Sequence, residues 1–299
     1  MTFTSDPMCC APTGDRCGEG VVWRPEEQVI YWTDINRFLI HRFDPANGSV
    51  KSWLFDEPVT AVLLTDRDGT LAVVLGSRVI YWEPSSDSRR DQGFRLPGWP
   101  AVRLNDAGID PTGWLWAGSM QNNVNADGSE GPIDQTCGVL YRIDPHGAAS
   151  DIPDRIGISN TFVWSPDHTR FYFGDTLENA IRQYDYDGVT ASIGRPNPFF
   201  SGFSRGLPDG SAIDEQGYVW NCRWDGGCIV RVAPDGQVDR VIDLPTRNIT
   251  NCTFGGKDLS ILYVTTAASP DAGDRLAGSL FAIETSVRGM PEGRFRIAG

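Results

Sequence analysis

The sequence predicts an all-β protein, a six-bladed β-propeller of four-stranded antiparallel blades around a central channel. Two observations lead to this fold class. Short runs of β-branched and aromatic residues alternate with turn clusters such as DPANG at 44–48, DPTGW at 110–114 and DYDGV at 184–188, which is typical of antiparallel strands. In addition, no window of a dozen residues has the i, i+3, i+4 apolar spacing of a helix.

The turn clusters group into six units, each long enough for three or four strands. A repeat of about 40–50 residues is typical of propeller blades, whereas a sandwich or an up-and-down barrel has many strands without a long repeat in register. We expect one domain over residues 1–299, in which residues before Gly14 supply a strand that closes the ring. The units cover approximately 18–55, 59–94, 103–153, 158–199, 207–245 and 249–284.

The composition excludes several classes of protein. The chain is 40% hydrophobic and 22% charged, as in ordinary globular domains, and its formal net charge is −13. This charge argues against partners such as nucleic acid or an anionic membrane, which require clustered Lys and Arg. There is no apolar run of about 18 residues and no apolar leader segment. We therefore expect a cytoplasmic protein, either a monomer or a weak homo-oligomer.

The cysteines and histidines do not predict a disulfide framework or a zinc site. Seven cysteines is an odd number, and no CxxC pair occurs. The three histidines are predicted to lie in or near turns or on an outer strand. We interpret the adjacent pair Cys9-Cys10 as reduced surface thiols.

The strongest functional signal is a side-chain oxygen that recurs at one place in four units. In each unit this residue stands four positions before an apolar residue of the first strand-like run. The four residues are Glu19, Asn105, Asn160 and Asp209, which precede Trp23, Ile109, Trp164 and Ile213. Because the first strand of every blade lines the channel, equivalent positions converge on one axis. Asx-turns before strands are the structural alternative for each residue taken alone.

The converging set predicts a metal site. Glu19, Asn160 and Asp209 would supply two carboxylates and an amide oxygen. This all-oxygen set suits Ca²⁺, Mg²⁺ or Mn²⁺, with Zn²⁺ or Fe²⁺ possible. Without a cation, two carboxylates held together would repel, and one would stay protonated.

Two further features near this set have competing interpretations. Arg103 could orient a polyol or a carbonyl group by its fixed fork of donors, or it could form a salt bridge to Asp106 or Asp110. The third unit is lengthened by MQNNVNADGSEGPIDQTCG at 120–138; this loop is either functional or a surface excursion. The recurring tryptophans Trp23, Trp116, Trp164 and Trp220 are better explained by packing between blades than by sugar stacking.

Five motifs, in order, resemble those of the senescence-marker protein (regucalcin)/gluconolactonase family. They are RCGEGVVW, RLNDAGIDPTGWLWAGSM, ISNTFVWSPD, LPDGSAIDEQGYVW and CTFGGKDLSILYVT. The match extends from about Arg16 to the C-terminal IAG. The resemblance implies a six-bladed propeller with one divalent metal in the channel, which hydrolyses intramolecular sugar esters.

Carried over by motif, the resemblance assigns roles to individual residues. Glu19, Asn160 and Asp209 would be metal ligands, and Arg103 and Asn105 would contact the substrate. The sequence departs from the family in two places. Thr161 follows the ligand Asn160 where the family usually has Gly, and Asp134 matches a loop acid that is Glu in close relatives; we assign Asp134 to substrate binding.

The resulting hypothesis is hydrolysis of a sugar lactone, of the gluconolactone or pentonolactone type, to its aldonic acid. The metal would polarise the carbonyl group, and Asp209 would be the general base. No GxSxG nucleophile elbow occurs, which disfavours a covalent acyl-enzyme. The alternatives are a metal-dependent phosphotriesterase or aryl esterase, and a non-enzymatic calcium-binding regulator or interaction scaffold.

Overall fold

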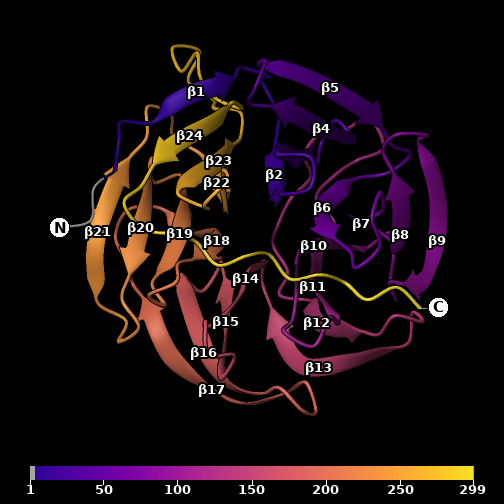
Figure 1. Ribbon diagram of the computed structural model, residues 1–299. Helices are drawn as coiled ribbons and strands as arrows, with labels where there is room; N and C mark the ends of the chain where they lie inside the picture. The colour runs from indigo at the N-terminus through magenta and orange to yellow at the C-terminus, as the bar shows by residue number, and fades with distance from the viewer. Residues whose placement is uncertain (1–3, 299) are drawn as a thin grey trace.

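The computed structural model describes residues 4–298 and confirms the six-bladed propeller (Figure 1). In this range the chain forms 24 strands in six four-stranded antiparallel sheets, with no helix. It follows that this part of the chain has no helix of the length and apolarity needed to cross a bilayer. The sheets are arranged in a ring, with the first strand of each blade nearest the central channel.

The first three blades follow the chain without interruption. Blade one contains β2 (Gly18–Arg24), β3 (Val29–Asp34), β4 (Leu39–Asp44) and β5 (Ser49–Leu54). Blade two contains β6 (Val59–Leu64), β7 (Leu71–Leu75), β8 (Arg78–Glu83) and β9 (Ser88–Arg95). Blade three contains β10 (Val102–Ile109), β11 (Leu115–Gln121), β12 (Gly138–Ile143) and β13 (Ala149–Ile156).

The remaining blades complete the ring. Blade four contains β14 (Ser159–Trp164), β15 (Arg170–Asp175), β16 (Ala180–Asp187) and β17 (Ser192–Ser201). Blade five contains β18 (Leu207–Ile213), β19 (Val219–Trp224), β20 (Cys228–Val232) and β21 (Val238–Asp243). Blade six contains β22 (Ile249–Gly255), β23 (Ile261–Thr266), β24 (Leu280–Glu284) and the N-terminal β1 (Met8–Ala11).

The ring is closed by pairing the two ends of the chain. β1 forms the outer edge of blade six, antiparallel to β24, with Met8 opposite Ala282 and Cys9 opposite Phe281. This is the predicted closure by the segment before Gly14. Closing the ring removes the two free blade faces that an open array of sheets would expose.

A second closure was not predicted. After β24 the chain crosses the ring at the end of the channel where the innermost strands finish (Figure 1). Backbone amides of this tail bond to three different blades: Met290 N to Ile213 O (3.0 Å), Phe295 N to Leu64 O (2.9 Å) and Arg296 N to Gly113 O (3.0 Å). The tail therefore blocks one mouth of the channel.

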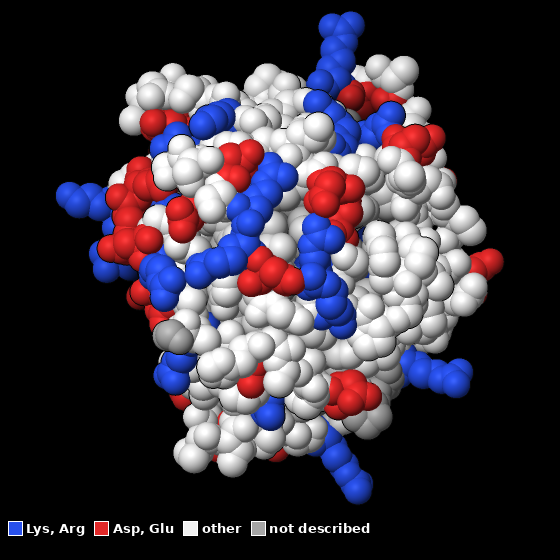
Figure 2. All heavy atoms as spheres, turned by 90° about the vertical axis from the view of Figure 1, so that its right-hand side faces the viewer, with Lys and Arg blue, Asp and Glu red and all other residues white. Residues whose placement is uncertain are grey.

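The outer surface carries interspersed charges. Figure 2 faces the side of the molecule that includes β9, and basic and acidic side chains are mixed there. Several form ion pairs on blade two, including Arg78 with Asp56 (3.1 Å) and Arg89 with Asp87 (3.0 Å). Because these pairs are exposed, each contributes little to stability, about 0–1 kcal/mol.

The core consists of apolar side chains packed between neighbouring blades. The four recurring tryptophans are all buried, with 0–8% of their surface exposed. Trp116 of blade three and Trp164 of blade four both contact the ring of Phe171, at centroid distances of 5.2 and 4.7 Å. These residues therefore pack between blades, as expected, and do not form a sugar-stacking platform.

Buried aspartates join turns to the tryptophans of the next strand. Asp110 Oδ1 accepts the backbone N–H groups of Thr112 and Trp114, and its Oδ2 accepts Trp116 Nε1 (2.8 Å). Asp214 makes the equivalent bond to Trp220 (2.9 Å) in blade five. Each aspartate thus fixes a hairpin turn and satisfies a buried indole N–H.

Replacing Asp110 should therefore cost more stability than replacing Asp144, which begins a similar DPxG turn. Asp144 caps its turn through the backbone amides of His146 and Ala148 but has no bond to a tryptophan. We expect Asp110→Ala to lower the free energy of unfolding by about 1–3 kcal/mol more than Asp144→Ala. Urea denaturation of both variants tests this, and equal losses would contradict it.

Candidate active site

The innermost strand of every blade changes register near the mouth of the channel opposite the tail. A β-bulge at this place changes the direction of one or two side chains, which no longer follow the alternation between the two faces of the sheet. The irregularities lie between Glu19 and Val22, Val59 and Ala61, Leu104 and Ala107, Asn160 and Phe162, Pro208 and Ser211, and Ile249 and Cys252. All four predicted oxygen donors lie at or within these bulges.

Glu19 and Asp209 meet at this mouth, although they lie in blades one and five. Their carboxyl groups are within hydrogen-bonding reach of each other and only 6% and 7% exposed. Glu19 Oε2 also accepts Gly20 N and Asn251 Nδ2, each at 2.7 Å. Burial, followed by repulsion from Glu19, raises the pKa of Asp209 well above its usual range, and burial also raises the pKa of Glu19.

Asn160 is oriented beside this pair by blade four. Its Nδ2 donates to Thr176 Oγ1 (2.8 Å), which leaves the amide oxygen to face Asn105, whose Nδ2 is 3.5 Å away. Thr176 Oγ1 in turn donates to Pro208 O (2.7 Å), next to Asp209. The amide group of Asn160 thus has a fixed direction, with its oxygen toward Asn105.

Thr161 adopts the left-handed backbone conformation that glycine tolerates better, with φ of 58°. This conformation is a rare one for a β-branched residue. The side chain compensates through hydrogen bonds across the blade boundary: Oγ1 donates to Asp209 O (2.7 Å) and lies 2.8 Å from Ser211 Oγ. Thr161 therefore ties the strand of Asn160 to the strand of Asp209.

The three donors fit a divalent cation. Two buried carboxyls in contact cannot both ionise without a compensating charge, and a hard cation with oxygen ligands supplies that charge. The donor set is chemically consistent, since it offers two carboxylates and one oriented amide oxygen. Sequence reasoning missed Asn251, which holds Glu19; its position in the innermost strand of blade six was the available signal.

A second acidic group lies in blade one but is better explained as a hydrogen-bond network. The ligand atoms of Asp15, Asp34 and His41 all lie within 4.8 Å of one another. Asp15 Oδ2 accepts Trp32 Nε1 (2.7 Å), and Asp15 Oδ1 lies 3.2 Å from His41 Nε2. Asp34 accepts the backbone amides of residues 16, 17 and 37. These hydrogen bonds occupy Asp15 Oδ2 and both Asp34 oxygens, while Asp15 Oδ1 and His41 Nε2 face each other without a further hydrogen bond to a described residue.

Arg103 and Asn105, which were predicted to contact the substrate, lie together beside Asn160. Arg103 Nη1 donates to Asn105 Oδ1 (2.6 Å), while Nε and Nη2 donate to Asn123 Oδ1 (3.0 and 2.8 Å). Asn105 Nδ2 donates to Ser159 O (2.8 Å). The alternative of a salt bridge to Asp106 or Asp110 is wrong: among the described side chains of residues 4–152 and 155–298, Arg103 forms none.

The long loop between β11 and β12 reaches over to blade one. The carbonyl oxygen of Gly128 accepts Arg16 Nη1 (3.1 Å) and Asn36 Nδ2 (3.0 Å). The loop therefore extends from blade three past blade two at the same end of the channel as Glu19. Asp134 is exposed on this loop, and its Oδ1 accepts Gln121 Nε2 (3.0 Å). Its role in substrate binding stays a prediction.

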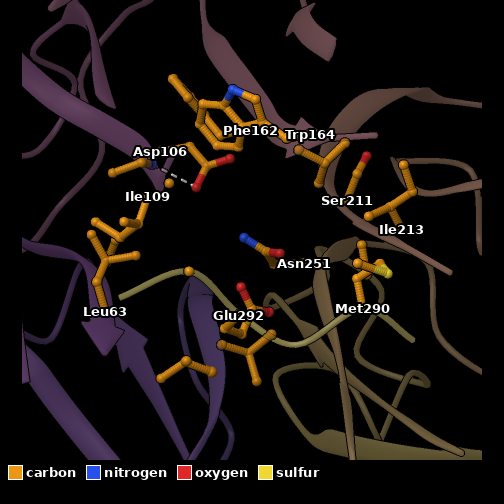
Figure 3. Close-up of a pocket in the computed structure, with 18 of the residues that line it drawn as sticks. Leu63, Asp106, Ile109, Phe162, Trp164, Ser211, Ile213, Asn251, Met290 and Glu292 are labelled. Atoms are coloured by element: carbon orange, nitrogen blue, oxygen red, sulfur yellow. Dashed lines mark hydrogen bonds between the residues drawn. The ribbon is translucent and has the colours of Figure 1, made fainter. Parts of the chain in front are cut away.

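Between the donors and the tail lies a cavity of about 140 Å³ (Figure 3). Asp106, Asn251 and Glu292 point into it from β10, β22 and the tail. The Glu292 carboxyl borders this cavity and accepts a hydrogen bond from Thr253 Oγ1 (2.7 Å). Burial by the surrounding protein raises the pKa of Glu292. Burial raises the pKa of Asp106 well above its usual range. The carboxyls of this cavity therefore favour their neutral forms.

The fold and the site together define a class: a six-bladed propeller with buried oxygen donors gathered at one mouth of its channel. The model of the family described as SMP-30/Gluconolactonase/LRE-like region matches residues 17–268. The chain therefore belongs to this family, as its motifs predicted.

The most similar relatives include two lactonases. The chain is 34% identical over 296 residues to pentonolactonase XacC of Haloferax volcanii, covering 94% of this chain and 95% of the relative. It is 35% identical over 289 residues to 6-deoxy-6-sulfogluconolactonase of Pseudomonas putida, covering 93% and 94%. Lactonases are carboxylic ester hydrolases, so both relatives support the predicted class of enzyme.

The fold also matches that of a solved structure, a calcium-binding protein named regucalcin from Agrobacterium tumefaciens. The TM-score is 0.90 at 24% identity, over 98% of each chain. At this level of identity the similarity shows the fold alone.

The metal-free protein should lose stability as the pH rises above the range in which unfolded carboxyls titrate, about pH 4. Unfolded carboxyls titrate near pH 4, whereas the folded pKa values of Glu19 and Asp209 are raised. The unfolded chain therefore releases these protons first, and ionisation increasingly favours unfolding until the folded pKa is passed. Thermal denaturation with a chelator measures this. Asp209→Asn should flatten the pH dependence, and an identical slope in the variant would contradict the prediction.

Gly128→Ala should release the long loop from blade one. Gly128 has φ of +77°, and a Cβ atom there would lie 2.1 Å from Asn36 O. We expect faster cleavage of the exposed Glu130 by a glutamate-specific protease, since local opening exposes loop backbone. Gly131→Ala is the control, because its Cβ would meet nothing closer than 3.7 Å. Equal cleavage rates in the two variants would show that the contact does not hold the loop.

Proposed function

We propose that this protein is a metal-dependent hydrolase that opens a sugar lactone to its aldonic acid. The observation that carries the proposal is the contact between the buried Glu19 and Asp209 carboxyls beside the oriented amide of Asn160. The lactonase relatives support a sugar lactone as substrate and suggest a pentonolactone or a gluconolactone. The oxygen donors are compatible with Ca²⁺, Mg²⁺, Mn²⁺, Zn²⁺ or Fe²⁺.

Glu19, Asn160 and Asp209 would hold the divalent cation. When bound, it supplies Lewis-acid polarisation of the lactone carbonyl and stabilises the charge that develops on its oxygen. The protein's part is to keep the donors in place. Gly20 and Asn251 fix the Glu19 carboxylate, and Thr176 fixes the Asn160 amide.

Asp209 is the proposed general base. Its backbone oxygen is held by Thr161 Oγ1 (2.7 Å) and Asn221 Nδ2 (3.2 Å), which restricts the carboxyl group to the channel mouth. Asp209 would accept a proton from the attacking water as the new bond forms between water oxygen and carbonyl carbon. The ester C–O bond to the ring oxygen then breaks, and the leaving hydroxyl takes up the proton.

Arg103 and Asn105 are proposed to orient the lactone. Their mutual hydrogen bond sets both side chains beside Asn160, so donors can meet ring hydroxyls while the carbonyl lies near the metal ligands. Holding the reacting groups in line in this way lowers the entropic part of the barrier. Asp134 could contribute from the loop if its bond to Gln121 exchanges for one to a hydroxyl.

Lactone hydrolysis should depend on both the cation and Asp209. We expect turnover of D-xylono- or D-glucono-lactone that is lost with a chelator and restored by a divalent metal. Asp209→Ala should reduce kcat at least about a hundred-fold, because it removes a general base and also a metal ligand. The rates are followed by acid release, and metal affinity by calorimetry. Full activity of Asp209→Ala would contradict the proposal.

The same assay separates the two alternatives. Faster metal-dependent hydrolysis of paraoxon or phenyl acetate than of any lactone would favour a phosphotriesterase or aryl esterase. Tight calcium binding without turnover of any ester would favour a calcium-binding regulator. Asp44→Ala, which alters an exposed turn on blade one, serves as the control variant with parental activity.

A further inference from the structure

Arg103 is a buried cation whose hydrogen-bond partners are all neutral. Only 4% of its surface is exposed. Its guanidinium group donates to the amide oxygens of Asn123 and Asn105 and to the carbonyl oxygen of Leu104 (3.0 Å). Buried charges in proteins are usually paired with an opposite charge, because burial without a partner costs free energy. Arg103 has no such partner among the side chains that the structure describes, those of residues 4–152 and 155–298.

The negative charge near Arg103 would be balanced by the cation of the proposed site. Glu19 and Cys17 are the groups whose charge acts on Arg103, and burial is the main cause that lowers the pKa of Arg103 to about 10. The Cys17 thiol stays neutral, because burial raises its pKa well above the usual range. Glu19, together with Asp209, balances the divalent cation of the proposed site. The mouth of the channel then keeps one net positive charge, on Arg103.

Arg103 and Asn123 each keep N–H donors that make no hydrogen bond to another described residue. A guanidinium group has five N–H donors, and the four hydrogen bonds of Arg103 leave one N–H on Nη2. The Asn123 oxygen accepts twice from Arg103, while its Nδ2 donates to no group among the described residues. Asn123 is partly exposed, so its two N–H groups can reach a ligand.

We propose that Arg103 and Asn123 form a subsite for an anionic group on the substrate. The preferred lactones would then carry an acidic substituent, such as a carboxylate, sulfonate or phosphate, at the end away from the lactone carbonyl. A guanidinium fork with an adjacent amide suits such oxygens, since charge-assisted hydrogen bonds are the stronger ones. The inference rests on the proposed lactone hydrolysis and names the class of lactone.

The residue at 123 determines this preference. An aspartate there would pair with Nε and Nη2 of Arg103, in place of the amide oxygen that now accepts both. It would neutralise the cation and remove the Nδ2 donors, so an anionic substituent would meet a carboxylate instead. A neutral lactone has no such substituent and would lose only contacts to hydroxyls.

The test compares D-glucaro-1,4-lactone and 6-phosphogluconolactone with D-glucono-1,5-lactone. For the parental protein we expect a higher kcat/KM for the anionic lactones. In Asn123→Asp the ratio of anionic to neutral kcat/KM should fall roughly ten-fold or more, through KM, as expected for loss of a charged hydrogen bond. Asn123→Ala should lower the ratio less, because it removes donors without adding a charge.

Asn122→Asp is the matched control, with the same change of charge one residue away. Asn122 Nδ2 donates to Pro100 O (3.0 Å), and its Oδ1 accepts Val124 N, so it does not contact Arg103. The ratio should stay parental in this variant. A fall as large as that of Asn123→Asp would mean that general electrostatics, and not a subsite, sets the preference.

Equilibrium binding provides a readout without turnover. The parental protein should bind D-glucarate more tightly than D-gluconate, and Asn123→Asp should abolish the difference. If neither lactone ratio nor acid binding changes in Asn123→Asp, the Arg103–Asn123 contact only anchors the loop, and the inference is wrong. If no lactone is hydrolysed, the proposed function is wrong, while the glucarate measurement still tests the subsite by itself.

Discussion

The site depends on one electrostatic constraint: Glu19 and Asp209 bring two carboxyl groups together in a buried place. A propeller creates this constraint, because equivalent positions of all blades converge on its axis. Hydrogen bonds from neighbouring blades fix each group: Asn251 of β22 donates to Glu19, and Thr161 of β14 donates to the backbone oxygen of Asp209. Because two buried carboxyls in contact cannot both ionise without a compensating charge, this arrangement favours either a shared proton or a bound cation.

The number of blades and their boundaries could be predicted because they depend on local turn chemistry that repeats along the chain. Aspartates such as Asp110 and Asp214 bond their own turns, so each hairpin is specified by adjacent residues. The crossing of the ring by the tail was not predictable in this way. Residues such as Phe295 bond to Leu64 and lie far from it in sequence, and no repeat marks such a contact.

The proximity of Glu19 to Asp209 and of Asn105 to Asn160 was expected from their common register, but the partners that orient these side chains were not predicted. The bulge in every innermost strand shifts side chains locally, and a pattern of period two cannot show which residue of a pair turns inward. For this reason Asn251 was missed. Asn123 was missed for another reason: it lies at the start of an irregular loop, and its contact with Arg103 depends on how that loop folds back.

The closure of the ring has a consequence for the order in which the protein can assemble. β1 and β24 are partners, yet at roughly 5–20 residues per second the roughly 270 residues between them take tens of seconds to synthesise. Throughout that time the N-terminal strand has an unpaired edge, and the thiols of Cys9 and Cys10 are open to oxidants. Once blade six forms, Cys10 Sγ donates to Leu280 O (3.3 Å), and burial raises the pKa of this thiol to about 12. The pairing of β1 with β24 therefore disfavours the thiolate of Cys10, the form that reacts with oxidants.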